Sequence, residues 1–276
     1  METERRKRGV TMRVALCQME VVQGDRAGNR SRAEAMVRES AGRRADVVVL
    51  PEMWTCGYDF AHLSEHTEEI DGETATLLGR WARQYGIWLV GGSFPIEFAD
   101  GVSNTALTFA PDGTLVNLYR KIHLIGLMDE DRYLVPGETR ATFALGETGT
   151  PDSTRAGVMI CYDLRFPELA RAHVLEGAEV LFLPAEWPVQ RADHWRTLLI
   201  ARAIENQAFV IGVNIVGRND RDRFTGGSLA VDPWGRVVTE AGTKPGIVYA
   251  DLDLSIVADV RQKMTVLKDR RPKAYL

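Results

Sequence analysis

A thiol, a carboxylate and an ammonium group each follow an apolar run that is typical of a β-strand. Glu52 comes directly after VVVLP, Lys121 after LVNLYR, and Cys161 after AGVMI. In α/β sheets the carboxyl ends of the strands form the crevice in which ligands bind, so we expect these three side chains to converge. Together they would supply a nucleophile, a general base and a cation that stabilises an oxyanion.

Cys161 has the most informative surroundings of the three. It lies in RAGVMICYDLRFPELAR, where an apolar run ends and a helix-like stretch begins a few residues later. The positive helix end and the free backbone N–H groups at such a turn would lower the pKa of the thiol and hold an oxyanion. Of the other cysteines, Cys17 lies in a predicted core strand and Cys56 in a Gly-Tyr-Asp loop, so we expect both to pack.

Taken singly, each of these residues also has an ordinary structural interpretation. Glu52 could cap a loop, Lys121 could be a surface lysine, and Cys161 could be a small buried hydrophobe. Their common position at the ends of predicted strands is what favours a catalytic role.

The elements that must position these residues alternate along the chain between short Val-, Ile- and Leu-rich runs and segments of helical period. Ser31 and Asp193 are the expected N-caps of two helices, and Gly86 is the expected stop of another. The predicted strands are 13–19, 46–54, 87–93, 179–184 and 209–215, the predicted helices are 31–45, 74–86, 166–178 and 193–209, and hairpins are predicted around PDGT (111–114) and DPWG (232–235).

The two halves of the chain repeat one pattern. A strand, a helix and DVVVLPEMW in the first half correspond to GVMICYD, a helix and EVLFLPAEW in the second. Strands that are apolar on both faces belong to sheets that are covered on both sides. We therefore predict an α/β fold in which two pseudo-repeated halves form a four-layer αββα sandwich. We expect a single domain over 12–276 and a disordered tail over 1–11.

Composition narrows the classes of partner and compartment. The 276 residues are 45% apolar and carry a net charge of −4, which gives no reason to expect nucleic acid or an anionic membrane as a partner. The apolar runs are too short to span a bilayer, and no apolar export signal follows the basic start METERRKR. The 3 cysteines argue against a disulfide framework, so we expect a cytoplasmic protein.

The blocks LPEMWTCGYD, YRKIHLIGLMDEDRYLVPGE and GVMICYDLRFPELAR resemble the three signature blocks of the nitrilase, or carbon–nitrogen hydrolase, superfamily. The resemblance extends from about Met12 to the C-terminus. Within the superfamily the chain most resembles the omega-amidase branch, and HLIGLMDEDRYL, PAEWP and HWRTLLIARAIENQ resemble its bacterial methionine-salvage members. This resemblance implies a nitrilase-like fold that needs no metal or organic cofactor.

The resemblance also implies a role for each residue of the site. Glu52 would be the general base, Lys121 the cation that stabilises the oxyanion, and Cys161 the nucleophile. Glu130 corresponds to a second glutamate that orients the lysine, although it could instead be a solvated loop acid. The backbone N–H of Tyr162 would be a second donor to the oxyanion.

The substrate implied by the resemblance is a short dicarboxylic acid monoamide with a 2-oxo acid at its free end, such as 2-oxoglutaramate or 2-oxosuccinamate. Its carboxylate needs a partner, and Arg165 could supply a bidentate fork or could instead pair with a structural acid. Tyr58 and Trp187 would line the pocket or simply pack. Glu186 would repel an anionic substrate unless His194 or an arginine neutralises it.

Other functions stay open at this point. Within the same superfamily, the substrate could be a carbamoyl amino acid, a deaminated glutathione, an aliphatic amide or a nitrile. A non-catalytic binding protein on this fold is a further alternative, but the complete set of Glu52, Lys121 and Cys161 argues against it. The string HLSEH (62–66) matches a zinc-protease pattern without the sustained apolar helix that such a site needs.

The resemblance further implies a homodimer or a larger homo-oligomer. Relatives of this kind associate through the helix that follows the nucleophile and through C-terminal arms. The segment at about 255–276, which ends in RQKMTVLKDRRPKAYL, resembles such an arm, whereas its ordinary interpretation is a partly ordered tail.

Overall fold

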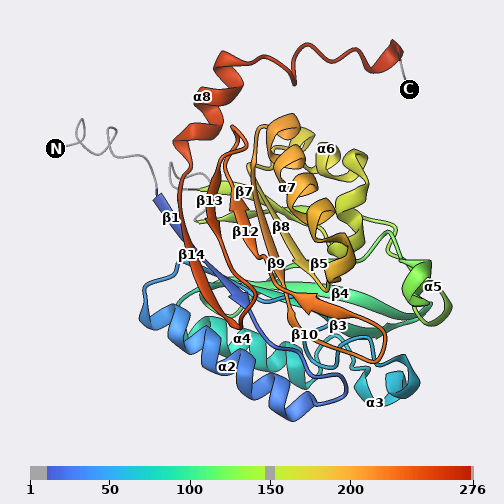
Figure 1. Ribbon diagram of the computed structural model, residues 1–276. Helices are drawn as coiled ribbons and strands as arrows, with labels where there is room; N and C mark the ends of the chain where they lie inside the picture. Colours follow the sequence, from blue (N-terminus) through green and yellow to red (C-terminus); the bar gives the residue numbers. More distant parts are fainter. Residues whose placement is uncertain (1–10, 147–152, 275–276) are drawn as a thin grey trace.

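Two six-stranded sheets stack face to face in the computed structural model, which describes residues 11–146 and 153–274 (Figure 1). The first sheet has the strand order β14-β1-β2-β3-β4-β5, and the second has the order β13-β12-β9-β8-β7-β6. The strands are β1 (Thr11–Gln18), β2 (Val47–Val49), β3 (Trp88–Phe98), β4 (Gly101–Phe109), β5 (Leu115–Arg120), β6 (Thr142–Leu145), β7 (Thr154–Val158), β8 (Val180–Ala185), β9 (Phe209–Asn214), β10 (Val216–Arg218), β11 (Arg223–Thr225), β12 (Leu229–Val231), β13 (Val237–Glu240) and β14 (Gly246–Asp253).

Helices cover the outer face of each sheet, so the predicted four-layer αββα sandwich is confirmed (Figure 1). α2 and α4 lie on the first sheet, and α6 and α7 lie on the second. The α-helices are α2 (Arg26–Gly42), α3 (Leu63–His66), α4 (Glu73–Tyr85), α5 (Glu130–Tyr133), α6 (Pro167–Leu175), α7 (Ala192–Asn206) and α8 (Ser255–Lys263), and the 3-10 helices are η1 (Phe60–His62), η2 (Gly126–Met128), η3 (Cys161–Arg165), η4 (Val189–Arg191) and η5 (Pro272–Ala274).

The main core lies between the sheets. Leu16 and Val49 from the first sheet belong to the same buried cluster as Phe182 and Ile211 from the second. A second cluster joins the outer face of the first sheet to α2 and α4. Burial on both faces explains why these strands are almost continuously apolar instead of alternating.

The predicted repeat corresponds to two parallel three-stranded units. β1, β2 and β3 run parallel in the first sheet, as do β7, β8 and β9 in the second. β5 has the same direction as β3, because both are antiparallel to β4. The carboxyl ends of β2, β5, β7 and β8 therefore precede Glu52, Lys121, Cys161 and Glu186, respectively.

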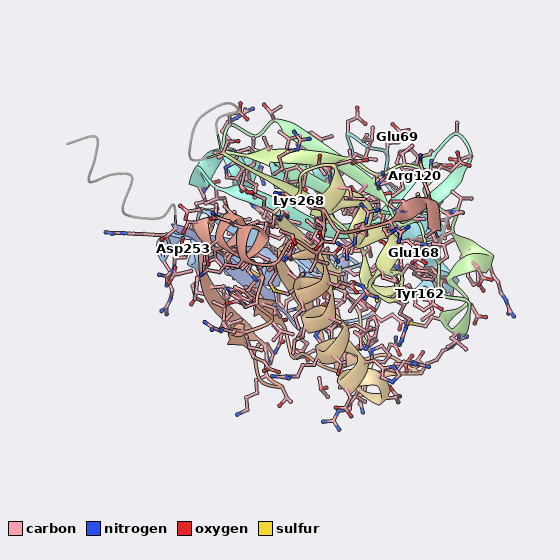
Figure 2. All side chains as sticks on the ribbon, turned by 90° about the horizontal axis from the view of Figure 1, so that it is seen from above. Glu69, Arg120, Tyr162, Glu168, Asp253 and Lys268 are labelled. Carbon is pink, nitrogen blue, oxygen red and sulfur yellow. The ribbon has the colours of Figure 1, made fainter. Side chains whose placement is uncertain are left out.

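A view from above shows at which end of the sandwich the candidate residues lie. Figure 2 shows Arg120, the last residue of β5, on the same side of the molecule as Tyr162, which follows Cys161. Asp253, the last residue of β14, lies on the opposite side. The candidate residues thus gather at the end of the sheets where β5 and β7 finish.

Two predicted helix starts are wrong. α2 begins at Arg26, ahead of Ser31, because the Asp25 carboxylate accepts a hydrogen bond from the Gly28 N–H at 3.0 Å and caps the helix there. α7 begins at Ala192, so Asp193 lies in its first turn and is not its N-cap. The predicted stop of α4 at Gly86 is confirmed, since this residue has a left-handed φ of 63°.

The end of the chain contributes a strand that the sequence analysis did not predict. β14 pairs antiparallel with β1 along its whole length and forms the edge of the first sheet. α8 follows, with Val257 and Val260 buried, so the predicted arm at 255–276 begins with a helix that packs on the body. The segment after α8 passes across the top of the molecule in Figure 1, and its Leu267 packs against the main core.

The predicted disordered tail at 1–11 lies outside the described residues except for Thr11, with which β1 begins. Within residues 11–146 and 153–274, no helix is both long enough and apolar enough to cross a membrane.

The close packing of β3 against the segment that contains Glu52 can be tested at Gly92. Its φ is +64°, and an added Cβ would lie 2.0 Å from the Pro51 carbonyl oxygen. Gly92→Ala should lower the free energy of unfolding by about 3 kcal/mol or more, because it adds a backbone clash to left-handed strain. Gly86→Ala is the matched control, since its φ is +63° and nothing lies within 4 Å of the added Cβ; it should cost about 1 kcal/mol. Equal losses in urea unfolding would contradict this account of Gly92.

Candidate active site

A fully buried ammonium group is the centre of the site. Lys121 follows β5, where its backbone N–H donates to the Asn104 carbonyl at 2.9 Å and its carbonyl accepts from the Gly137 N–H at 2.8 Å. Its Nζ donates to Glu52 Oε1 at 2.9 Å and to Glu130 Oε2 at 2.8 Å, and all three side chains are 0% exposed. Lys121 is therefore not a surface lysine, and Glu130 is not a solvated loop acid.

Two neutral side chains complete this group. The Asn104 amide donates to Glu52 Oε1 at 2.8 Å and to Glu130 Oε1 at 3.1 Å. The Tyr58 hydroxyl donates to Glu52 Oε1 at 2.7 Å. Tyr58, predicted as a pocket wall, thus contacts both the cation and the acids. Asn104 was not among the predicted site residues, because in β4 it stands between Ser103 and Thr105 and nothing in the sequence sets it apart from them.

Burial and charge act against each other at these groups. Burial alone would lower the pKa of Lys121, but the charges of Glu130 and Glu52 reverse this effect and hold its pKa above the ordinary value. Burial, with the charge of Glu52, raises the pKa of Glu130 in spite of the nearby ammonium. The lysine thus stays protonated, and a proton on Glu130 costs less than it would in water.

Cys161 lies at a sharp turn between β7 and η3. Its φ is +44°, a left-handed conformation that costs a non-glycine residue about 1–2 kcal/mol. Asp163 holds the turn, because its Oδ2 accepts from the Ile160 N–H at 2.8 Å and from the Tyr119 hydroxyl at 2.6 Å. The thiol is 3% exposed, and its Sγ lies 3.8 Å from the Glu186 carbonyl oxygen.

The expected lowering of the thiol pKa is wrong. Burial and the negative charge of Glu52 raise the pKa of Cys161 well above its ordinary value, and the ammonium of Lys121 offsets this only in part. The helix that follows directly is the five-residue η3, which offers a short dipole. The sulfur therefore rests as a thiol, and a base must remove its proton before it can act as a nucleophile.

The backbone of Glu186, which follows β8, connects the second sheet to the buried group of Lys121, Glu52 and Glu130. The Glu186 N–H donates to Glu52 Oε2 at 2.8 Å, while its carbonyl faces the Cys161 sulfur. The expected neutralising contact with His194 is not formed, because His194 Nδ1 faces an Arg165 nitrogen at 3.4 Å. Nor does Arg165 or another described arginine pair with Glu186.

Arg165, Tyr162 and Trp187 form an aromatic and cationic patch beside the thiol. The guanidinium of Arg165 lies 4.7 Å from the centre of the Trp187 ring and 5.9 Å from that of Tyr162. Trp187 is buried and donates through its indole N–H to the Arg191 carbonyl at 2.7 Å. No acidic side chain in the described parts of the chain forms a salt bridge with Arg165, so the alternative of a structural partner has no support.

Surface loops form a mouth above the buried group. A cavity of about 230 Å³ is lined by Gln23, residues 58–61, Met128, Asp129, Tyr133 and residues 219–222. Its two rims are joined where Arg221 donates to Asp129 Oδ2 at 2.6 Å. Tyr58 belongs both to this cavity and to the group around Lys121, so the mouth leads toward the candidate residues.

The zinc-protease string does not form a metal site in the described residues. His62 ends η1 and His66 ends the four-residue α3, so the sustained helix required by the pattern is absent there. Both histidines face one carboxylate, that of Asp59. Among residues 11–146 and 153–274 no group of His, Cys, Asp and Glu side chains is arranged to hold a metal ion.

Comparisons with known proteins find one matching family and several near full-length relatives. The model of the carbon–nitrogen hydrolase family matches residues 13–262. The chain is 43% identical to the 2-oxoglutaramate amidase of Bacillus subtilis, over 95% of this chain and 98% of that protein. It is 37% identical to the omega-amidase NIT2 of Mus musculus, over 96% and 97%. The crystal structure of Nit3 from Saccharomyces cerevisiae, a nitrilase-superfamily member, matches with a TM-score of 0.86 at 30% identity, over 95% and 97%.

Cysteine labelling tests whether the site activates its thiol. Burial raises the pKa values of Cys17 and Cys56 to about 12, and the hydrogen-bond partner of the Cys17 sulfur is the Ser40 hydroxyl at 3.7 Å. Iodoacetamide should label Cys161 at least about tenfold faster than either, because Glu52 can accept its proton. Peptide mass spectrometry over a time course measures the three rates.

Glu52→Gln is the matched variant for this labelling, since it keeps the shape of the side chain and removes the base. It should bring the rate at Cys161 close to the rates at the two other cysteines. Slow and equal labelling of all three in the unmodified protein would contradict activation and favour a non-catalytic binding protein.

Proposed function

Because the chain belongs to the carbon–nitrogen hydrolase family, we propose that it removes ammonia from a short 2-oxo dicarboxylic acid monoamide such as 2-oxoglutaramate or 2-oxosuccinamate. Hydrolysis of amides is the activity of its near full-length relatives, and the chain is a hydrolase of this kind. The proposed substrate class is supported mainly by the 43% identity to a 2-oxoglutaramate amidase over nearly the whole of both chains.

In the proposed first half-reaction, Cys161 is the nucleophile and Glu52 is the general base. Glu52 takes the thiol proton, and the sulfur attacks the amide carbon. The oxygen that becomes negative is held by the Lys121 ammonium and by the Tyr162 backbone N–H. Glu52 then gives its proton to the departing nitrogen, so that ammonia leaves and a thioester to Cys161 remains. The Lys121 contacts to Glu52 and Glu130 support this scheme, because they fix the cation without the help of substrate.

In the proposed second half-reaction, water replaces ammonia. Glu52 takes a proton from the water, whose oxygen attacks the thioester carbon. The carbon–sulfur bond breaks, the 2-oxo acid leaves, and the proton on Glu52 returns to the sulfur. Glu130 orients Lys121 throughout, which its 2.8 Å contact with Nζ supports.

The substrate carboxylate is proposed to bind Arg165. Its guanidinium is partly exposed, is stacked on Trp187, and forms no salt bridge with the acidic residues that the structure describes. An aromatic platform holds the planar fork in place, which lowers the entropy lost when it binds a carboxylate. Tyr58, Tyr162 and Trp187 would line the path between this fork and Cys161.

The cellular setting follows from the substrate. We propose a cytoplasmic enzyme of a single domain over 12–276, which clears the 2-oxo acid amides that glutamine or asparagine transaminases release, including the one that ends methionine salvage. The resemblance of PAEWP and HWRTLLIARAIENQ to methionine-salvage members supports this role. The three unpaired cysteines are compatible with a reducing compartment.

A homodimer is proposed through the face of α6 and α7 and through the arm at 255–276. Leu175 and Ile204, at the ends of these helices, are 50% and 51% exposed, and Met264 after α8 is 50% exposed. Sedimentation at micromolar concentration should therefore give twice the chain mass, and Leu175→Arg with Ile204→Arg should shift it toward the monomer. A stable monomer of the unaltered chain would contradict the proposal.

The activity test is ammonia release from a panel of substrates: 2-oxoglutaramate, 2-oxosuccinamate, glutamine, N-carbamoyl-β-alanine, a simple aliphatic amide and a nitrile. We expect turnover confined to the 2-oxo acid amides. Cys161→Ala should lower it about 10⁴-fold or more, because the nucleophile acts as a unit with its base. Cys17→Ala, in the core of the first sheet, is the matched control and should retain activity. Turnover of another panel member alone would keep the mechanism and change the substrate.

A further inference from the structure

Glu186 presents a buried carboxyl group that the proposed mechanism does not use. Its residue is 1% exposed, and its Oε1 has no hydrogen-bond partner among the described residues. Its backbone, by contrast, is fully engaged with Glu52 and Cys161. A buried polar atom without a partner is costly, so its presence at the site points to a partner that arrives with the substrate.

The Glu186 side chain lines a small cavity that shares residues with the mouth cavity. Glu186 lines this cavity of about 10 Å³ together with Tyr58, Asn219 and Arg218, and no salt bridge joins Arg218 to it among the described residues. Tyr58 and Asn219 also line the larger mouth cavity of about 230 Å³. The backbone carbonyl oxygen of Glu186 lies 3.8 Å from the Cys161 sulfur, so a substrate whose amide carbon lies at the sulfur is held next to this residue.

The surrounding charges decide the protonation state of Glu186. The carboxylates of Glu52, Glu130 and Asp222 act on it, and Lys121 is the cation that offsets them. That ammonium already bonds to Glu52 and Glu130. Burial, followed by the charge of Glu52, raises the pKa of Glu186 well above its ordinary value. The raised pKa favours the neutral acid of Glu186, which can donate a hydrogen bond where a carboxylate can only accept.

We propose that Glu186 is a specificity-determining residue, whose neutral carboxylic acid donates a hydrogen bond to an acceptor oxygen at the 2-position of the substrate. This inference rests on the proposed function. In a 2-oxo acid amide a short methylene chain separates the oxo group from the amide, which brings the oxo oxygen beside Glu186 when the amide is at Cys161. The monoamide of glutaric acid has no oxygen at this carbon, so it leaves the O–H of Glu186 without that acceptor.

The test compares three substrates that differ only at this carbon: 2-oxoglutaramate, the monoamide of glutaric acid, and glutamine. Glu186→Gln keeps the size and a donor, whereas Glu186→Met keeps the length and removes hydrogen bonding. Glu186→Met should lower kcat/KM for 2-oxoglutaramate about tenfold to a hundredfold and change that for glutaric acid monoamide less than about threefold. Glu186→Gln should stay within about threefold of the unaltered enzyme on both.

Two controls separate this role from a structural one. The rate of Cys161 labelling by iodoacetamide should be unchanged in both variants if the catalytic group is intact. The infrared carbonyl stretch of a protonated carboxylic acid, measured at neutral pH, should be present in the unaltered protein and absent from Glu186→Gln.

Each other outcome has a definite reading. An equal loss on both amides in Glu186→Met would indicate a structural residue and overturn the inference. A loss on 2-oxoglutaramate in Glu186→Gln as large as in Glu186→Met would indicate an ionised carboxylate and also overturn it. If the unaltered enzyme hydrolyses none of the three substrates, the proposed function itself fails, and the inference fails with it.

Discussion

The ammonium of Lys121 is the interaction on which the rest of the site depends. A cation at 0% exposure is stable only if it is paired and hydrogen-bonded, and Glu52, Glu130 and Tyr58 supply those partners. Breaking a buried pair of this kind typically costs about 3–5 kcal/mol, because the charge that remains has no partner. Since Lys121 follows β5 while Glu52 and Tyr58 lie in the segment after β2 and Glu130 begins α5, the same contacts set the catalytic geometry and fix how these segments pack.

The backbone of Glu186 extends this constraint to the second sheet. The Glu186 N–H donates to Glu52, and the Glu186 carbonyl faces the sulfur of Cys161. The backbone of one residue therefore fixes the positions of both the base and the nucleophile. The enclosure that makes these contacts strong also holds the thiol in its neutral form. Reactivity therefore depends on proton transfer within the enclosed group more than on a thiolate that exists beforehand.

The layers, the repeat and the convergence of the strand ends could be predicted from the sequence. Apolar runs mark the buried strands directly, and Pro and Gly residues mark where the strands and helices end. The sequence was insufficient where long-range pairing decides the outcome. β14 has 8 residues but is only partly apolar, and its strand character comes from its pairing with β1. The direction of the Cys161 pKa shift was also missed, because a local helix dipole is visible in sequence whereas burial among acids from other elements is not. Asn104 was passed over because its two acidic partners lie far along the chain.

The pairing of β14 with β1 also bears on how the protein is made. Thr11 lies opposite Asp253, so the first strand to leave the ribosome waits for nearly the last before its outer edge is covered. Until then, the row of free N–H and C=O groups along β1 is a template for pairing with other chains. Contacts between such distant segments form late and slow the folding of the whole domain. A ribosome-bound chain that stops short of residue 246 would contain every candidate catalytic residue and still have an open sheet edge.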